Sequence, residues 1–195
     1  MGRDVVAPER KIIIWVGGGR THWNMNTGTS RVMLTIFGNR YTRLLLIAGA
    51  VCIVDQIVKA LIVSTVPVYQ SISVIPGFFN LTHIYNPGGA FGFLSGSSSE
   101  LRHLFFLISS FVAMGLILFL YAKTPPGQGL LAFGLSLIMG GAIGNIIDRI
   151  RIGKVIDFLD VYIMDLHWPA FNVADSAITI GIGLFVYHLL FKDLD

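Results

Sequence analysis

Charged side chains are scarce in this chain. Only 13% of its 195 residues are charged, against about a quarter in an ordinary soluble domain, and 54% are hydrophobic. So many apolar residues exclude a disordered chain, and so few polar ones argue against a water-soluble globule. The single cysteine, Cys52, excludes an intrachain disulfide.

Basic residues are also few, and they are unevenly placed. The 14 Lys and Arg residues exceed the 11 Asp and Glu residues by three, and seven of the 14 lie before residue 44. A nucleic-acid-binding protein would spread its basic side chains along one face. We therefore expect no nucleic-acid partner, and we interpret the imbalance as a determinant of membrane orientation.

Four long apolar runs predict transmembrane helices at about 43–63, 101–121, 127–148 and 171–191. About 20 helical residues rise about 30 Å, the thickness of the hydrocarbon layer. In lipid the backbone must satisfy its own hydrogen bonds, which a helix does. Alternating residues between two of these runs predict a small β element at about 68–93. The fold class expected is an all-α membrane protein with an extracytoplasmic β element.

The basic residues also predict the topology. The three nearest to the start of the first span are Arg31, Arg40 and Arg43. This places both termini in the cytoplasm, and the connection 64–100, which has no Lys or Arg, outside. The other outer connection, 148–170, departs from the rule with Arg149, Arg151 and Lys154. We interpret residues 1–42 as a flexible cytoplasmic extension, with Met33 as an alternative start.

Carboxylates gather at the predicted outer membrane boundary. Asn145 and Asp148 end the third span, and Asn172 and Asp175 begin the fourth, each pair three residues apart on one helix face. Two carboxylates that lie close together share a proton. One then acts as a base on water while the other protonates a carbonyl oxygen, as in aspartic proteases. The pattern suggests hydrolysis that needs no metal.

The individual acids differ in their surroundings. Asp157 has apolar neighbours, so desolvation is expected to raise its pKa, as a general acid requires. Asp148 adjoins Arg149, and we interpret it as the member of a structural ion pair. Asp175 begins a helix, where N-cap and first-turn carboxylates are common for structural reasons, so both a structural and a catalytic role stay open. Two acids are interpreted as solvated loop residues: Asp160 and Asp165.

Other polar and small residues leave alternatives open. Asp55 and Lys59 are four residues apart, so they form either a structural ion pair or a substrate-positioning one. Three glycines of the third span serve either helix packing or approach of a substrate: Gly140, Gly141 and Gly144. No cofactor is expected. Four scattered histidines lack metal-ligand spacing, and most of them are interpreted as surface or interfacial side chains: His83, His103, His167 and His188.

Five motifs carry a resemblance to a known family. In chain order they are Asp-Gln-Ile-Val-Lys at 55–59, Asn-Pro-Gly-Gly-Ala-Phe-Gly at 86–92, Gly-Gly-Ala-Ile-Gly-Asn-Ile-Ile-Asp-Arg at 140–149, Val-Ile-Asp-Phe at 155–158 and Phe-Asn-Val-Ala-Asp-Ser at 171–176. Over about 41–191 the chain resembles the bacterial lipoprotein signal peptidases, also called signal peptidase II.

The resemblance implies an intramembrane aspartic endopeptidase of the bacterial inner membrane, with Asp157 and Asp175 as its catalytic pair. It would cleave diacylglyceryl-modified prolipoproteins before the lipidated cysteine, at the outer face. We expect its partners to be these substrates and membrane lipids, and the enzyme to be monomeric. Asp55 and Lys59 match a structural motif. Eight residues match positions that bind substrate or shape the site: Asn86, Gly88, Phe91, Asn145, Asp148, Arg149, Asn172 and Ala174.

Three other classes stay open on the residues alone. A proton-coupled transporter would place acids deep in several spans and use structural repeats, whereas here only Asp55 lies in mid-span. A lipid-modifying enzyme would hold magnesium through aspartates. A non-enzymatic scaffold would leave the polar cluster unexplained.

Overall fold

The computed structural model describes residues 12–16, 19–23, 39–88 and 98–191. The chain forms two units, residues 1–43 and 44–195. In the first unit, β1 (Ile12–Val16) and β2 (Gly19–Trp23) pair as an antiparallel hairpin that the sequence did not predict. Met33 lies outside the described residues. The flexibility and the cytoplasmic position of residues 1–42 stay predictions.

Four helices are long and apolar enough to cross a membrane. They are α2 (Arg40–Thr65), α3 (Ser99–Lys123), α4 (Gly129–Ile152) and α5 (Val173–Phe191). The prediction of four spans is confirmed, but α4 runs beyond the expected end at residue 148. Its last turn holds Arg149 and Arg151, where cations interact favourably with the helix dipole.

Helix α4 is the central helix. Of its most apolar window 56% is buried, against 6% for α3. Glycines let the neighbouring helices approach it closely. A Cβ added at Gly140 would lie 2.7 Å from the Ala48 carbonyl oxygen of α2, and one at Gly141 would overlap the Ala174 carbonyl of α5. Helix packing therefore accounts for these glycines.

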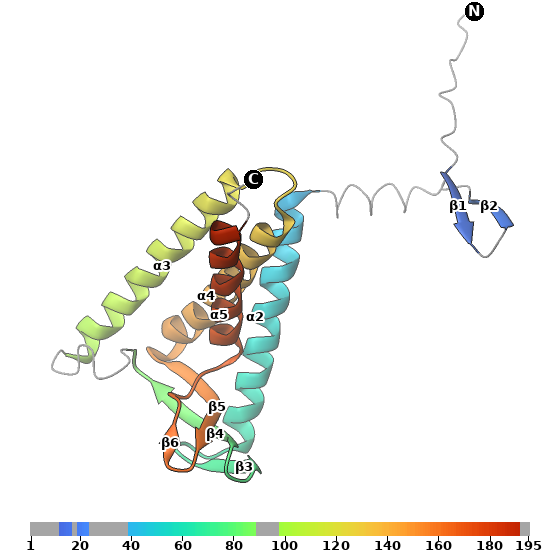
Figure 1. Ribbon diagram of the computed structural model, residues 1–195. Coiled ribbons are helices and arrows are strands. Elements are labelled where there is room, and N and C mark those ends of the chain that lie inside the picture. Colours follow the sequence, from blue (N-terminus) through green and yellow to red (C-terminus); the bar gives the residue numbers. More distant parts are fainter. Residues whose placement is uncertain (1–11, 17–18, 24–38, 89–97, 192–195) are drawn as a thin grey trace, which may run out of the picture. The chain divides into compact units, whose positions relative to one another are not determined.

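Beside the helices lies a four-stranded antiparallel sheet. Its order is β3 (Ser71–Ile75), β4 (Phe79–Asn86), β5 (Val155–Ile163) and β6 (Leu166–His167). Figure 1 shows it at the end of the bundle where α2 and α4 end and α5 begins. The predicted β element of 68–93 is confirmed for β3 and β4, and its last residues lie outside the described ones. Strands β5 and β6 were not predicted.

Apolar and backbone contacts fix β5 against two helices. Phe158 packs with Ile62 and Val66 in a buried cluster at the end of α2. The backbone N–H groups of Phe158 and Leu159 both donate to the Phe171 carbonyl, just before α5 begins. The middle of β5 is thereby held beside the first turn of α5. The polar side chains of β5 are therefore close to those of the first turn of α5.

Candidate active site

Asp157 is a buried carboxylate in the middle of β5, with 1% of its surface exposed. Asn86 Nδ2 donates to its Oδ2 at 2.8 Å, and Asn172 Nδ2 donates to its Oδ1 at 2.7 Å. Burial raises the pKa of this carboxyl to about 7; the Asp175 charge adds to the rise, while the two amides lower it. Asp157 is therefore able to hold or release a proton near neutral pH.

A bulge in β4 brings Asn86 to Asp157. Between the pairs Leu81–Leu159 and Ile84–Asp157, β4 has one residue more than β5. Because side chains alternate between the faces of a sheet, one extra residue reverses the face that the following β4 side chains share with β5. Asn86 consequently lies on the same face as Asp157 and reaches it diagonally across the two strands.

Asp175 lies in the first turn of α5. Its backbone N–H donates to Asn172 Oδ1 at 2.8 Å, so Asn172 caps this helix. Its own Oδ1 accepts a hydrogen bond from Asn145 Nδ2 at 2.8 Å. Asp175 is therefore not the N-cap, because Asn172 fills that position. It is an acid of the first turn, where a negative charge favours the helix dipole, so the structural alternative stays open beside the catalytic one.

Asn172 connects the two acids. Its amide nitrogen donates to Asp157, and its amide oxygen accepts from the backbone of Asp175. The same nitrogen lies 3.3 Å from Asn145 Oδ1, which links the two asparagines. Asn172 has no exposed surface, so its orientation is fixed by these contacts. Residues from three elements thus converge on one buried polar cluster.

Lys59 of α2 is the buried cation of this cluster. Its Nζ lies 2.8 Å from Asp55 Oδ2 and 2.7 Å from Asp148 Oδ2, and it donates to Asn145 Oδ1 at 3.1 Å. Only 2% of the lysine is exposed. The expected Asp55–Lys59 pair is confirmed, and it is half of a three-charge group. The three ammonium protons have three acceptors.

Asp148 belongs to a structural ion pair, as expected, but its partner is Lys59 and not Arg149. Consecutive residues of a helix point in different directions, so the two side chains do not face each other. Asp148 pairs with Lys59, whereas Arg149 Nη1 donates to Ser110 Oγ of α3 at 3.1 Å. The Arg149 guanidinium also lies 5.9 Å from the centre of the Phe106 ring. Arg149 directly follows Asp148 in the last turn of α4, so its backbone stays beside the cluster.

The remaining candidates border this cluster. Ala174 contributes its backbone N–H, which donates to Asp55 Oδ1 at 2.9 Å. Gly88 has a positive φ of 90°, and its N–H donates to Asn86 Oδ1 at 2.8 Å. A side chain at Gly88 would overlap the Phe106 ring, so glycine is required here. Phe91 lies outside the described residues.

Gln56 is a site residue that the sequence analysis missed. Its Nε2 donates to Asp148 Oδ1 at 3.0 Å and to the Gly144 carbonyl at 3.1 Å. Its position inside the motif at 55–59 was the only sequence feature that could have pointed to it. Gln56, Lys59 and Asp148 line a cavity of about 250 Å³.

Two predictions about polar residues outside the cluster are also wrong. Asp160 is 8% exposed instead of solvated, because it faces two partners in the sheet. Asn80 Nδ2 donates to its Oδ2 at 3.0 Å, and His167 Nδ1 lies 2.8 Å from its Oδ1. His83 and His188 are buried instead of interfacial; His83 Nδ1 bonds the Val66 carbonyl at 2.8 Å. Within the described residues, no three His, Cys, Asp or Glu side chains are grouped as metal ligands.

Comparisons with known proteins cover the same part of the chain. A family model described as signal peptidase (SPase) II matches residues 47–191, a range that contains every candidate site residue. A lipoprotein signal peptidase of Desulforapulum autotrophicum is 56% identical over 151 residues, which cover 77% of this chain and 93% of the relative. That of Syntrophus aciditrophicus is 48% identical over 148 residues, covering 76% and 92%.

A solved structure is similar as well. It is a bacterial membrane enzyme determined by the in meso method at 2.3 Å resolution, with a TM-score of 0.68 and 37% identity. The match covers 78% of this chain and 90% of that one. The helices and the sheet described above are therefore an arrangement that occurs in a known membrane enzyme.

Proposed function

Because this chain belongs to the signal peptidase II family of membrane-integral peptidases, which cleave the signal peptide from prolipoproteins, we propose that it does so by aspartic chemistry. Asp157 and Asp175 are the catalytic pair in this proposal. The two acids lie in one cluster, and asparagine amides hold both of them, which supports the proposal. Asn86 and Asn172 donate to Asp157, and Asn145 donates to Asp175. The observation that carries most weight is the position of Asn172, whose amide nitrogen donates to Asp157 and whose amide oxygen accepts from the backbone N–H of Asp175.

The proposed reaction begins with Asp157 protonated and Asp175 ionised. Asp175 takes a proton from a water molecule, whose oxygen attacks the scissile carbonyl carbon, while Asp157 gives its proton to the carbonyl oxygen. In the second step the carbon–nitrogen bond breaks. The nitrogen receives the proton now on Asp175, and Asp157 recovers a proton from a hydroxyl of the intermediate. Both carboxyls return to their starting states, and one water is consumed.

The surrounding residues are assigned supporting roles. Asn86, Asn145 and Asn172 hold the carboxylates in orientation by donating amide hydrogens to them. Gly88 shapes the segment that carries Asn86, and Phe91 is proposed to contact the acyl chains of the substrate. Arg149 completes the polar rim of the site.

The substrate and the location follow from the same premise. We assign as substrates prolipoproteins with a diacylglyceryl cysteine, cut just before that residue. The site lies at the end of the helices that bears the sheet, which is the outer face of the bacterial inner membrane if both termini are cytoplasmic. We propose that the enzyme acts as a monomer.

The test is cleavage by two conservative variants. Purified Asp157→Asn and Asp175→Asn enzymes are incubated with a lipidated prolipoprotein, and the size shift of the product is measured on a gel. Both variants should lose cleavage while remaining folded, since an amide cannot exchange the proton. Asp160→Asn is the control, because Asp160 is a buried β5 acid outside the cluster. Substantial cleavage by either of the first two variants would refute the proposal.

A further inference from the structure

Two backbone amides next to the proposed catalytic acids are held in the same way. The N–H of Ile156, the residue before Asp157, donates to Asp148 Oδ2 at 3.2 Å. The N–H of Ala174, the residue before Asp175, donates to Asp55 Oδ1 at 2.9 Å. Each acid therefore follows directly on a residue whose backbone is tied to a buried carboxylate.

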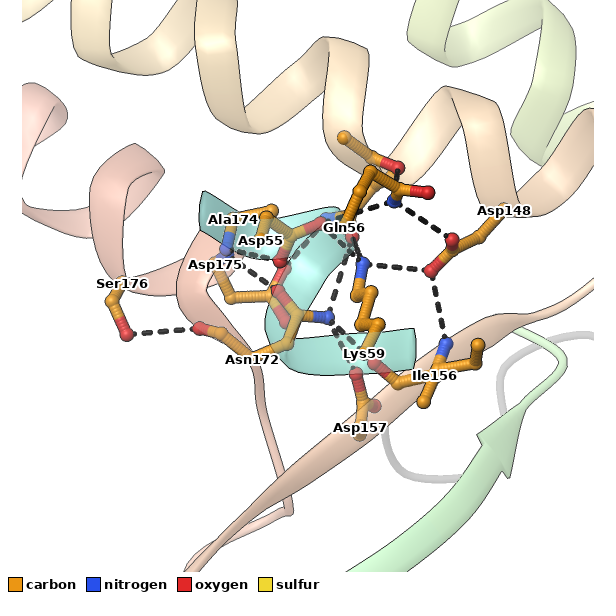
Figure 2. A network of polar contacts seen from close by, with 12 residues as sticks. Asp55, Gln56, Lys59, Asp148, Ile156, Asp157, Asn172, Ala174, Asp175 and Ser176 are labelled. Carbon is orange, nitrogen blue, oxygen red and sulfur yellow. Dashed lines mark hydrogen bonds and ion pairs between the residues drawn. The ribbon is translucent and has the colours of Figure 1, made fainter. Parts of the chain in front are cut away.

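Lys59 joins these two carboxylates. Asp55 and Asp148 come from different helices, α2 and α4, and would repel each other in a buried setting. The ammonium of Lys59 contacts both, at 2.8 and 2.7 Å, and so holds them on either side of a single cation (Figure 2). A continuous path thus runs from the backbone of β5 through Lys59 to the backbone of α5.

We propose that Lys59 is a positioning residue that sets the spacing between Asp157 and Asp175 by holding Asp148 and Asp55 together. The inference rests on the proposed function of the pair and adds a role to residues so far treated as an ion pair. Both carboxylates are already engaged with Lys59 and with these backbone amides, so we assign them no part in the chemical step. They act on the backbone that carries the two acids.

A side-chain path from Lys59 supports the same role. Lys59 Nζ donates to Asn145 Oδ1, and Asn145 Nδ2 donates to Asp175. The third ammonium proton of Lys59 is therefore donated to Asn145, the residue that orients Asp175. The charge of Lys59 also lowers the pKa of Asp157. Lys59 consequently affects both the position and the protonation of the pair.

Packing leaves little freedom for this group to rearrange. A Cβ added at Gly144 would lie 2.7 Å from Asp55 Oδ2, so the α4 backbone itself limits the position of that carboxylate. On the other side, Gln56 donates to Asp148 Oδ1 at 3.0 Å. Both carboxylates are thus confined around Lys59. Such confinement is what accurate spacing of two reacting groups requires.

The test weakens the two contacts of Lys59 with carboxylates one at a time. Asp148→Asn removes the charge of the side chain that accepts from Ile156 of β5. Asp55→Asn removes the charge of the side chain that accepts from Ala174 of α5. Both variants keep an oxygen that can accept a hydrogen bond. We expect kcat per folded enzyme to fall about tenfold or more in each, because a misplacement of about 1 Å costs about 100-fold. KM should change less than kcat, since both carboxylates are engaged with Lys59 and with backbone amides.

The pH profile separates positioning from mere stability. When two carboxyls move apart, their repulsion weakens and their apparent pKa values converge. The bell-shaped profile of kcat should therefore become narrower in both variants. Asp160→Asn is the matched control and should keep the wild-type width. A wild-type width and a wild-type kcat per folded molecule in Asp55→Asn and Asp148→Asn, with only a lower melting temperature, would overturn the inference.

A third variant serves if the two single variants fail to fold. Asp55→Asn/Lys59→Met/Asp148→Asn is free of buried charge in this group, and so avoids an unpaired ion. A narrower profile with reduced kcat in this variant supports the inference, and an unchanged profile overturns it. Failure of the proposed function itself would look different, because Asp157→Asn and Asp175→Asn would then retain cleavage whatever the outcome for Lys59.

Discussion

Asn86 and Asp157 are joined across the sheet by a hydrogen bond of 2.8 Å from the amide Nδ2 to the carboxylate Oδ2. The same strands hold a second pair of this kind, in which Asn80 Nδ2 donates to Asp160 Oδ2 at 3.0 Å. One pair belongs to the proposed site and the other does not. The chain therefore contains its own internal control for the effect of an asparagine on a buried acid.

Asn86→Ala should shift the basic limb of the pH–rate profile upward. Asn86 lowers the pKa of Asp157 by donating to its carboxylate, so removing the donor raises that pKa. A shift of about one pH unit is expected, because a hydrogen bond to a charged group is worth about 1.5 kcal/mol. The rate of prolipoprotein cleavage is measured from pH 5 to pH 9 (about the range that brackets neutrality). Asn80→Ala should leave the limb in place, and a downward shift in Asn86→Ala would contradict the assignment.

Protonation of Asp157 should also make stability depend on pH. Its pKa is about 7 in the folded protein and about 3.9 in an unfolded chain. The contribution is fully present below about pH 4 and is lost as the pH rises through about 7, by up to about 4 kcal/mol at about 1.4 kcal/mol per pKa unit. Melting temperatures of wild type and Asp157→Asn are compared at acidic and alkaline pH. The fall on raising the pH should be smaller in the variant, and equal falls would count against a protonated Asp157.

Gly144→Ala should displace Asp55. The new methyl group would lie 2.7 Å from Asp55 Oδ2, and overpacking of this kind costs about 1–3 kcal/mol. We expect a lower melting temperature together with reduced cleavage. Gly115→Ala on α3 is the matched helix variant, because nothing lies within 4 Å of its added Cβ. Equal behaviour of the two variants would show that Asp55 has room to move.

Gly88→Ala should reduce cleavage by misplacing Asn86. Its φ of 90° is unfavourable for alanine, and the added Cβ would overlap the Phe106 ring. Gly77 has a similar φ of 80° but nothing within 4 Å of an added Cβ, so Gly77→Ala shares the backbone strain without the overlap. Cleavage rates of both variants are normalised to folded enzyme. A loss in Gly77→Ala as large as in Gly88→Ala would mean that strain alone, and not Asn86, is responsible.

The four spans could be predicted from the sequence because the thickness of a bilayer sets both the length and the apolarity of a helix. Strand β5 could not, because Asp157 and Asp160 interrupt its apolar run and its partner β4 is far away in the chain. The meeting of Asn86 with Asp157 depends further on a one-residue bulge in β4. Register of this kind follows from packing and turn geometry and is not encoded in local composition.

The partners in the ion pairs were also beyond what local sequence could predict. Adjacency in the sequence suggested Arg149 as the partner of Asp148, whereas the partner is Lys59 on another helix. Lys59 was noticed through its spacing from Asp55, since residues four apart on a helix are neighbours. Contacts within one helix can be deduced from spacing. Contacts between helices require the packing that only the folded chain supplies.

The most direct measurement is an infrared titration of the carboxyl groups in the folded enzyme. The stretching band of a protonated carboxylic acid should disappear with a midpoint near pH 7, the value to which burial raises the pKa of Asp157, and cleavage should be lost over the same range. The band should be absent from Asp157→Asn and present in Asp160→Asn. A band that persists in Asp157→Asn, or a wild-type enzyme in which every carboxyl is already ionised well below neutral pH, would contradict Asp157 as the proton donor.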